Sequence, residues 1–250
     1  MEAALCVFDL LNGGLIMEES PKRPGGELSG RPLHFIWIAD CSGSMSVNGK
    51  IQTLNTAIRE ALPAMRKVSG ENPHAEVLVR AIKFSDGAMW HIGVPTPVDQ
   101  FQWKDLSSSG CTDMGKALKL VADELQKLEK AKLRGLPPVL VLISDGQPTD
   151  DFEKGLEALL NQPWGIKAVR IGIGIGKDAN LDILRKFINN PEFEPLEAKN
   201  ADALIKYIRW VTTSVLKAAS APPSQPHKGA SAANVPIPKD VPQVSANDIW

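Results

Sequence analysis

Three short segments of the chain carry hydroxyl and carboxylate side chains at close spacing. In the first segment, Asp40, Ser42 and Ser44 follow directly on an apolar run. Oxygen atoms of this kind are the ligands that hard divalent cations such as Mg²⁺ prefer, and Mg²⁺ commonly keeps several waters as well. Three residues are too few for a complete site, so further oxygen ligands must come from elsewhere in the chain.

Two later segments supply oxygens of the same kind. Thr112 stands between a polar loop and the start of a predicted helix, and Asp145 follows the most apolar run of the chain, residues 139–143. Loops after the carboxyl ends of parallel strands form the ligand sites of open α/β sheets. We therefore expect both residues to lie beside the first segment. Taken alone, each segment has a simpler explanation, because such residues also cap loops and helices.

The elements that position these residues alternate between strands and helices from residue 33 onward, which is typical of a mainly parallel sheet covered on both faces. Predicted strands are 33–39, 76–84, 89–92, 139–143, 167–175 and 193–196, and predicted helices are 50–68, 113–132, 151–160, 181–188 and 201–217. The turn Ser85-Asp86-Gly87 predicts that strand 89–92 is an antiparallel edge strand. The predicted fold class is α/β: Rossmann-like and doubly wound, with helices on both faces.

Together, the three segments resemble the von Willebrand factor A domain family and its metal-ion-dependent adhesion site. The matching residues are Asp40-Cys41-Ser42-Gly43-Ser44, Thr112 within Gly110-Cys111-Thr112-Asp113-Met114-Gly115, and Asp145-Gly146, in the order of the family. The resemblance implies that Ser42, Ser44 and Thr112 bind Mg²⁺ or Mn²⁺ directly and that Asp40 and Asp145 act through water. It also implies one open position for an Asp or Glu carboxylate of a protein partner.

The third segment, Ser144-Asp145-Gly146-Gln147-Pro148-Thr149-Asp150, is similar to that of the bacterial tellurium-resistance TerY-like branch. This resemblance implies a cytoplasmic adaptor or regulator in a stress or defence system, with a Ser/Thr kinase or phosphatase as partner. Some relatives carry a C-terminal zinc-binding domain, and the Pro-rich tail of this chain departs from that pattern.

We do not expect an enzyme, but a Mg²⁺-dependent phosphoryl-transfer or nucleotide-binding enzyme is the alternative. Residues 110–116 have the spacing of a phosphate-binding loop, yet Ala117 follows where Ser or Thr should hold Mg²⁺, and the preceding segment is polar. Residues 172–176, Gly-Ile-Gly-Ile-Gly, lack the dinucleotide-binding spacing, so close helix packing explains these glycines better.

Composition excludes several partner classes. The net charge of −1 provides no field to attract nucleic acid or an anionic membrane surface. The three cysteines and four histidines have no zinc-ligand spacing, which favours a reducing compartment. Cys41 and Cys111 flank the site segments; we interpret them as buried packing residues, with a redox switch as the alternative.

The expected organisation is a flexible extension at 1–32, one domain at 33–217 and a disordered Pro/Ala/Ser-rich tail at 218–250. We hypothesise that residues 1–16 are a wrongly assigned start or a weakly docked extension, and that residues 244–250 are either a docking peptide or an inert end. Asp150 and Asp151 are expected to cap helices rather than extend an acidic rim. Trp90, Phe101 and Trp103 could line a partner surface, but core packing is expected for at least one of them.

Overall fold

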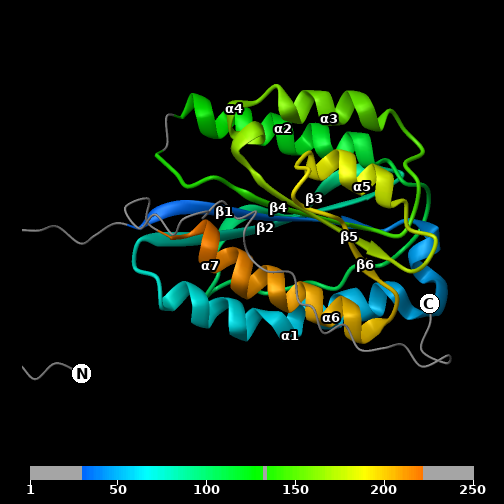
Figure 1. The fold of residues 1–250 in the computed structure, drawn as a ribbon, viewed down its shortest axis with the longest axis horizontal. Coiled ribbons are helices and arrows are strands. Elements are labelled where there is room, and N and C mark those ends of the chain that lie inside the picture. Colours follow the sequence, from blue (N-terminus) through cyan, green and yellow to red (C-terminus); the bar gives the residue numbers. More distant parts are fainter. Residues whose placement is uncertain (1–29, 132–133, 222–250) are drawn as a thin grey trace, which may run out of the picture.

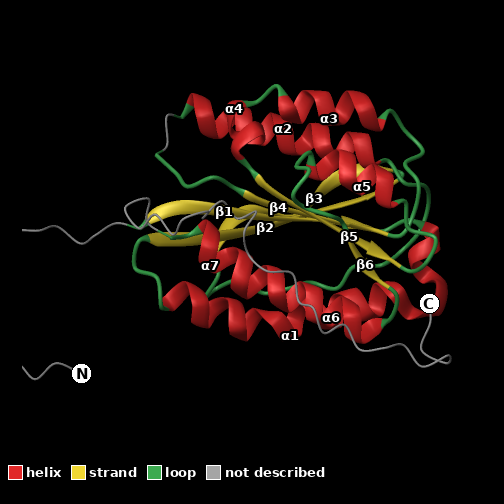
Figure 2. Cartoon of the chain, viewed as in Figure 1, coloured by secondary structure: helices red, strands yellow, loops and turns green. Residues whose placement is uncertain are grey.

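The computed structural model describes residues 30–131 and 134–221 of the 250-residue chain. One central sheet lies between two layers of helices (Figures 1 and 2). One face is covered by α1 (Lys50–Gly70), α6 (Ala201–Trp210) and α7 (Leu216–Ala219), and the other by α2 (Met114–Lys130), α3 (Phe152–Leu160), α4 (Pro163–Lys167) and α5 (Leu181–Ile188). The predicted doubly wound α/β architecture is confirmed.

The strand order of the sheet is β3-β2-β1-β4-β5-β6. The strands are β1 (Arg31–Asp40), β2 (Ala75–Ser85), β3 (Gly87–Pro97), β4 (Val139–Ser144), β5 (Val169–Ile175) and β6 (Leu196–Ala198). All neighbouring pairs are parallel except β2 and β3, which are antiparallel, so β3 is the predicted antiparallel edge strand. The chain winds outward from β1 in one direction and from β4 in the other. The boundary between β1 and β4 is therefore the point where the order reverses.

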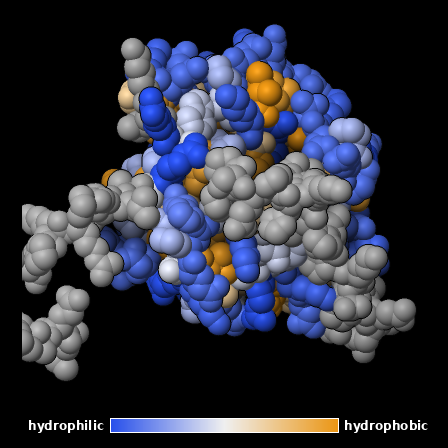
Figure 3. All heavy atoms as spheres, turned by 60° about the vertical axis from the view of Figure 1, so that its left-hand side comes forward, coloured by the Kyte–Doolittle hydropathy of each residue, from blue (hydrophilic) through white to orange (hydrophobic). Residues whose placement is uncertain are grey.

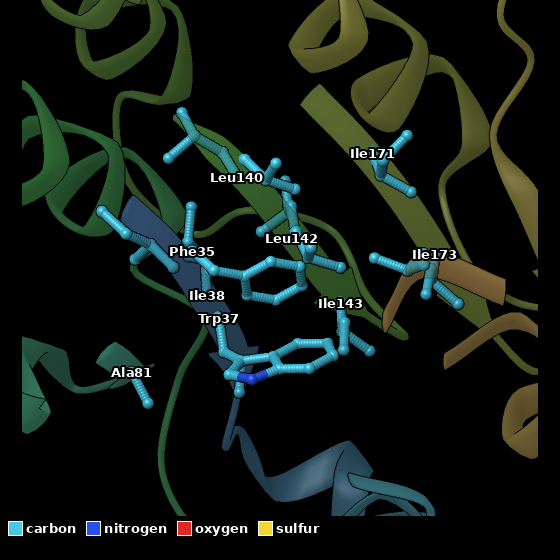
Figure 4. Close-up of a cluster of buried hydrophobic side chains, with 14 of the residues drawn as sticks. Phe35, Trp37, Ile38, Ala81, Leu140, Leu142, Ile143, Ile171 and Ile173 are labelled. Atoms are coloured by element: carbon cyan, nitrogen blue, oxygen red, sulfur yellow. The ribbon is translucent and has the colours of Figure 1, made fainter. Parts of the chain in front are cut away.

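The two central strands are buried on both faces, which explains their continuous apolar sequences. Every residue of β1 from Leu33 to Asp40 and every residue of β4 is buried. On one face of β1, Phe35 and Trp37 meet edge to face with 4.9 Å between ring centroids. Figure 4 shows these two rings within a cluster of buried hydrophobic side chains that includes residues of β1, β4 and β5. This packing holds the carboxyl ends of β1 and β4 in a defined position.

Three elements differ from the sequence-based prediction. β3 extends to Pro97 because its backbone continues to pair with β2 beyond two irregularities in register, although its side chains are half-exposed and show little alternation. The last strand is Leu196–Ala198 rather than 193–196, because Phe193 is buried within a turn and only Leu196 begins to pair with β5. The short helix α4 was not predicted, and strand 167–175 consequently begins at Val169.

The predicted helix 201–217 is present as α6, a π-helical turn at Val211–Val215 and then α7. Hydroxyl groups of Thr212 and Thr213 donate to carbonyl oxygens in the preceding turn, which favours such local widening. The side chain of Asn200 caps the start of α6 by accepting a hydrogen bond from the N–H of Ala203. No helix in the described part of the chain has the length and apolar character that would let it cross a membrane.

Large hydrophobic side chains are well separated where they reach the surface of the described chain. Val47, Met89, Val94 and Ile166 are the exposed ones; Met89 and Val94 lie on the edge strand β3, and Val47 and Ile166 lie on other elements. Figure 3 shows one face of the molecule, on which hydrophilic side chains surround separate smaller hydrophobic areas. The predicted extension at 1–16 and the predicted docking peptide at 244–250 lie outside the described residues.

Candidate metal centre

The predicted site residues lie at the carboxyl ends of β1 and β4, where the strand order reverses. Asp40 is the last residue of β1, and Asp145 directly follows β4. Ligand sites of open α/β sheets form at this kind of reversal point, because the loops on its two sides diverge and leave a crevice. Both carboxyl groups are buried.

Asp40 is held by hydrogen bonds to both of its carboxylate oxygens. The backbone N–H of Ser42 donates to Oδ1 at 2.8 Å, and the hydroxyl of Ser144 donates to Oδ2 at 2.5 Å. Burial raises the pKa of Asp40; the bonds from Ser144 and Ser42 oppose this shift, and the nearby charge of Asp145 adds to it. The carboxyl group is therefore fixed in orientation as part of the site, although burial disfavours its charged form.

The two serine hydroxyls form a chain that ends on the second carboxylate. Ser42 Oγ and Ser44 Oγ are 3.0 Å apart, and Ser44 Oγ donates to Asp145 Oδ1 at 2.7 Å. Thr112 faces the same space: a Cβ atom placed on Gly146 would lie 3.8 Å from Ser44 Oγ and 3.9 Å from Thr112 Oγ1. The structure thus brings oxygen atoms from all three predicted segments to one place at the carboxyl ends of β1 and β4.

Backbone hydrogen bonds tie the three loops together. The N–H of Gly43 donates to the carbonyl oxygen of Gly110 at 2.9 Å. Thr112 and Thr149 are joined twice at 2.9 Å, because each backbone N–H donates to an oxygen of the other residue. The position of Thr112 is therefore set by hydrogen bonds to the loop after β4 and by the contact of the neighbouring Gly110 with the loop after β1.

Helix α2 is capped from the loop after β4 and not by Thr112. Asp150 accepts hydrogen bonds from the backbone N–H groups of Gly115 and Lys116, both at 2.8 Å. The adjacent Asp151 caps α3 by accepting from the N–H of Lys154 at 3.1 Å. The prediction that the two aspartates cap helices is confirmed, and the explanation of Thr112 as a simple helix cap loses its basis.

Close packing of α2 against α3 sets the position of the helix that follows Thr112. A Cβ atom on Gly115 would lie 2.3 Å from the carbonyl oxygen of Asp151, and one on Gly155 would lie 2.2 Å from the carbonyl oxygen of Gly115. Both separations are well below van der Waals contact, so only glycine permits this approach. Gly115 thus permits the close helix packing that fixes the start of α2 and, with it, the position of Thr112.

Lys50 is the main site residue that the sequence analysis missed. It is the first residue of α1, it is buried, and its Nζ donates to Asp145 Oδ2 at 2.7 Å. Its position follows from Asn48 and Gly49, which have left-handed backbone conformations with φ of 52° and 70°. An Asn-Gly pair before a predicted helix indicates such a turn, but not the inward direction of the next side chain.

The atoms gathered here suit a hard cation. They are three hydroxyls and two carboxylates. Because Gly146 has no side chain, the space next to the hydroxyls of Ser44 and Thr112 stays open. Among residues 30–131 and 134–221, no group of three or more His, Cys, Asp or Glu side chains is arranged to hold a metal. A centre at this place therefore depends on hydroxyl oxygens, as Mg²⁺ and Mn²⁺ tolerate.

The two thiols beside the site are unpaired and differ in exposure. Cys41 is buried, as expected, whereas Cys111 is exposed, contrary to the expectation of two buried packing residues. Burial raises the pKa of the Cys41 thiol to about 12, and the side-chain hydrogen bond to Asp86 raises the pKa of Cys111. Thiolates are the reactive form, so both environments disfavour rapid oxidation. The redox switch stays a prediction.

Three aromatic residues near the site were considered as a partner surface or as core residues. Phe101 is fully buried and Trp103 donates to Asn55 Oδ1 at 3.0 Å from within the core, so core packing is confirmed for both. Trp90 is half-buried beneath Arg80, with 4.7 Å from guanidinium to ring centroid.

Neither glycine-rich segment has a nucleotide-binding setting. Residues 98–109, before the loop at Gly110, form no strand, whereas a phosphate-binding loop follows a buried strand. On β5, a Cβ atom on Gly172 would approach Leu184 to 3.0 Å, and one on Gly174 would approach Ala179 to 2.8 Å. These two glycines allow α5 to pack closely on the sheet, as predicted.

Comparisons with known proteins agree with this architecture. The sequence model of the von Willebrand factor type A domain matches residues 37–206. Cuticlin-6 of Caenorhabditis elegans is 26% identical over 185 residues, which cover 70% of this chain and 30% of that protein. This chain therefore spans less than a third of the length of that relative.

Solved structures share the fold at low sequence identity. The pilus adhesin SpaC of Lactobacillus rhamnosus GG is 15% identical with a TM-score of 0.59, covering 76% of this chain and 31% of SpaC. The von Willebrand factor type A protein from Catenulispora acidiphila is 16% identical with a TM-score of 0.55, covering 76% and 43%. Since the family match extends over more than half of the chain, this chain belongs to the von Willebrand factor type A domain family.

Proposed function

We propose that this chain is a divalent-cation-dependent protein-binding module. Ser42, Ser44 and Thr112 would hold Mg²⁺ or Mn²⁺ directly, with Asp40 and Asp145 orienting bound water. The cation would supply a Lewis-acidic position for an Asp or Glu carboxylate of a protein partner. With few anionic direct ligands, such a centre keeps enough positive charge to attract that carboxylate.

One observation carries this proposal. The hydroxyls of Ser44 and Thr112 come from loops far apart in sequence. A Cβ atom placed on Gly146 would nevertheless lie 3.8 Å from the first hydroxyl and 3.9 Å from the second. A hydroxyl at the start of a helix usually caps that helix, but Asp150 fulfils this role for α2. The Thr112 hydroxyl is therefore available to a ligand between the loops.

Calorimetric titration with Mn²⁺ and Mg²⁺ tests the metal site. We expect saturable binding by the wild-type protein and a loss of affinity of about tenfold or more in Thr112→Ala, the range seen when residues that support a metal site are removed. Thr96→Ala on the edge strand β3 is the matched control, because its hydroxyl only donates to the carbonyl oxygen of Val94. Equal affinity of wild type and Thr112→Ala would contradict the assignment.

Partner binding is tested by capture from an extract of the native cell. We expect wild-type protein to retain a partner in Mn²⁺ and to release it in EDTA, and Thr112→Ala to retain none. Retention that is the same in EDTA would separate any partner binding from the metal centre.

The partner class rests on two sources that point in different directions. The motif similarity to the TerY-like branch favours a cytoplasmic stress or defence regulator with a Ser/Thr kinase or phosphatase as partner. The names of the compared proteins, a cuticlin and a pilus adhesin, favour a structural or adhesive partner outside the cell. We propose the regulator, and identification of the captured protein by mass spectrometry decides between them.

A Mg²⁺-dependent phosphoryl-transfer enzyme is the alternative from another functional class. It predicts phosphate release from nucleotide in Mg²⁺ that is lost in Asp40→Ala. Partner capture without nucleotide turnover is the result that we expect.

A further inference from the structure

The buried ion pair between Lys50 and Asp145 has no role in the metal centre as described so far. Their side chains are only 8% and 0% exposed, and Nζ lies 2.7 Å from Oδ2. The other oxygen of Asp145, Oδ1, accepts the hydrogen bond from Ser44. Asp145 thus uses one oxygen toward the hydroxyls of the crevice and the other toward the ammonium group of Lys50.

This pair changes the net charge of the site. Without Lys50, Asp40 and Asp145 would contribute two negative charges when both are ionised; the ammonium reduces this to one. A buried charge without a partner is strongly destabilising, so the ammonium also stabilises Asp145 in a protein that holds no cation. With a divalent cation bound, the same centre would keep one positive charge instead of becoming neutral.

We propose that Lys50 is the built-in counter-cation of this centre. Without metal, its ammonium keeps Asp145 neutralised and the loops in place. With metal, it weakens cation binding and leaves a positive charge that selects an anionic group of the partner. The inference rests on the proposed metal-binding function and specifies how that function is tuned.

Lys50→Met tests the proposal, because methionine keeps an unbranched apolar chain and removes the charge. Calorimetry with Mn²⁺ alone should give a dissociation constant about tenfold lower than wild type, since a like charge close to the bound cation is removed from a poorly hydrated site. The melting temperature of the wild type should rise from EDTA to saturating Mn²⁺ only by the amount that cation binding to the folded state supplies, because the ammonium already neutralises Asp145 in EDTA. That of Lys50→Met should fall in EDTA and recover in saturating Mn²⁺.

Lys116→Met is the matched control. Lys116 also lies next to the site and pairs with Asp113 at 2.6 Å, but its side chain is 61% exposed. Solvent screens a charge in that position, so its removal should change the Mn²⁺ affinity by less than about threefold. Lys50→Arg, which retains the charge, should also bind Mn²⁺ within about threefold of wild type.

Several results would overturn the proposal. A folded Lys50→Met that binds Mn²⁺ no more tightly than wild type would show that the charge does not oppose the cation. A Lys50→Met that stays unfolded in saturating Mn²⁺ would show that the cation cannot replace the ammonium. Tighter Mn²⁺ binding by Lys50→Arg would show that the shape of the side chain, and not its charge, controls the cation affinity. If wild-type protein binds no Mn²⁺ or Mg²⁺ at all, the proposed function itself fails, which is a separate outcome.

Discussion

His34 makes the stability of this domain depend on pH in a way that can be calculated from the structure. It lies on β1, its ring is buried, and its Nδ1 has no hydrogen-bond partner among the described residues. Burial and, to a smaller extent, the positive charge of Arg80 lower the pKa of His34 to about 4, while Glu124 acts in the opposite direction. The imidazole is therefore neutral in the folded protein at pH 7.

The sign follows from proton linkage. The pKa of His34 in the folded state lies below its unfolded value of 6.5, so the unfolded chain takes up the proton first as the pH falls. The free energy of unfolding is unaffected by this residue above pH 6.5 and decreases between pH 6.5 and 4. The difference between the two pKa values corresponds to a loss of about 3 kcal/mol.

The perturbation is His34→Leu, which keeps an apolar side chain and removes the titrating group. Urea unfolding followed by circular dichroism at pH 7, 6, 5 and 4, in EDTA throughout, should show wild type losing about 3 kcal/mol more than the variant. His74→Gln is the control, because the His74 side chain is exposed. Parallel pH profiles of wild type and His34→Leu would refute the reasoning.

Three further predictions concern the supports of the site, and chemical unfolding measures each of them. Gly155→Ala should lower the free energy of unfolding by about 3 kcal/mol, because its Cβ would clash with the backbone of α2. The control is Gly70→Ala, where nothing lies within 4 Å and the free energy of unfolding should stay unchanged or rise by up to about 1 kcal/mol. Equal effects of the two substitutions would contradict the packing argument. Asn55→Ala should lose about 3 kcal/mol, because three buried hydrogen bonds that hold the loop before Thr112 would be broken; a loss below about 1 kcal/mol would show that the loop is held otherwise. Asp150→Ala should lose about 1–2 kcal/mol through the uncapped start of α2, and an unchanged stability would contradict that assignment.

The central part of the fold was predictable because burial on both faces leaves a clear signal. β1 and β4 are uninterrupted apolar runs, and helix α1 has an apolar stripe, so each began and ended close to the predicted residues. β3 was predicted too short because its half-exposed side chains show no regular alternation, and its length is set by pairing with β2. The five residues of α4 are too few for a periodic pattern.

The predicted site residues meet for a similar reason. Asp40 ends β1 and Asp145 directly follows β4, the two strands that the sequence marks most clearly, and parallel strands bring their carboxyl ends to one edge. Thr112 was harder to predict, because its own sequence context suits a helix cap equally well. Two features of the structure favour the role of a cation ligand over that of a helix cap. The loops at Gly43 and Gly110 are in contact, and Asp150 caps α2 in place of Thr112.

Lys50 could not be predicted in this way, because the amphipathic pattern of α1 treats its first residue as a polar helix end. A motif identifies the atoms that could hold a cation, but not the charges placed behind them. The Coulomb energy of a charge pair depends on the surrounding dielectric, so we expect the buried ammonium 2.7 Å from Asp145 to influence a cation at this place far more than the exposed Lys116 does. Two family members with the same hydroxyl and carboxylate groups at this place could therefore differ widely in cation affinity. In this chain we expect the ammonium of Lys50 to make the cation affinity lower than it would be without that charge.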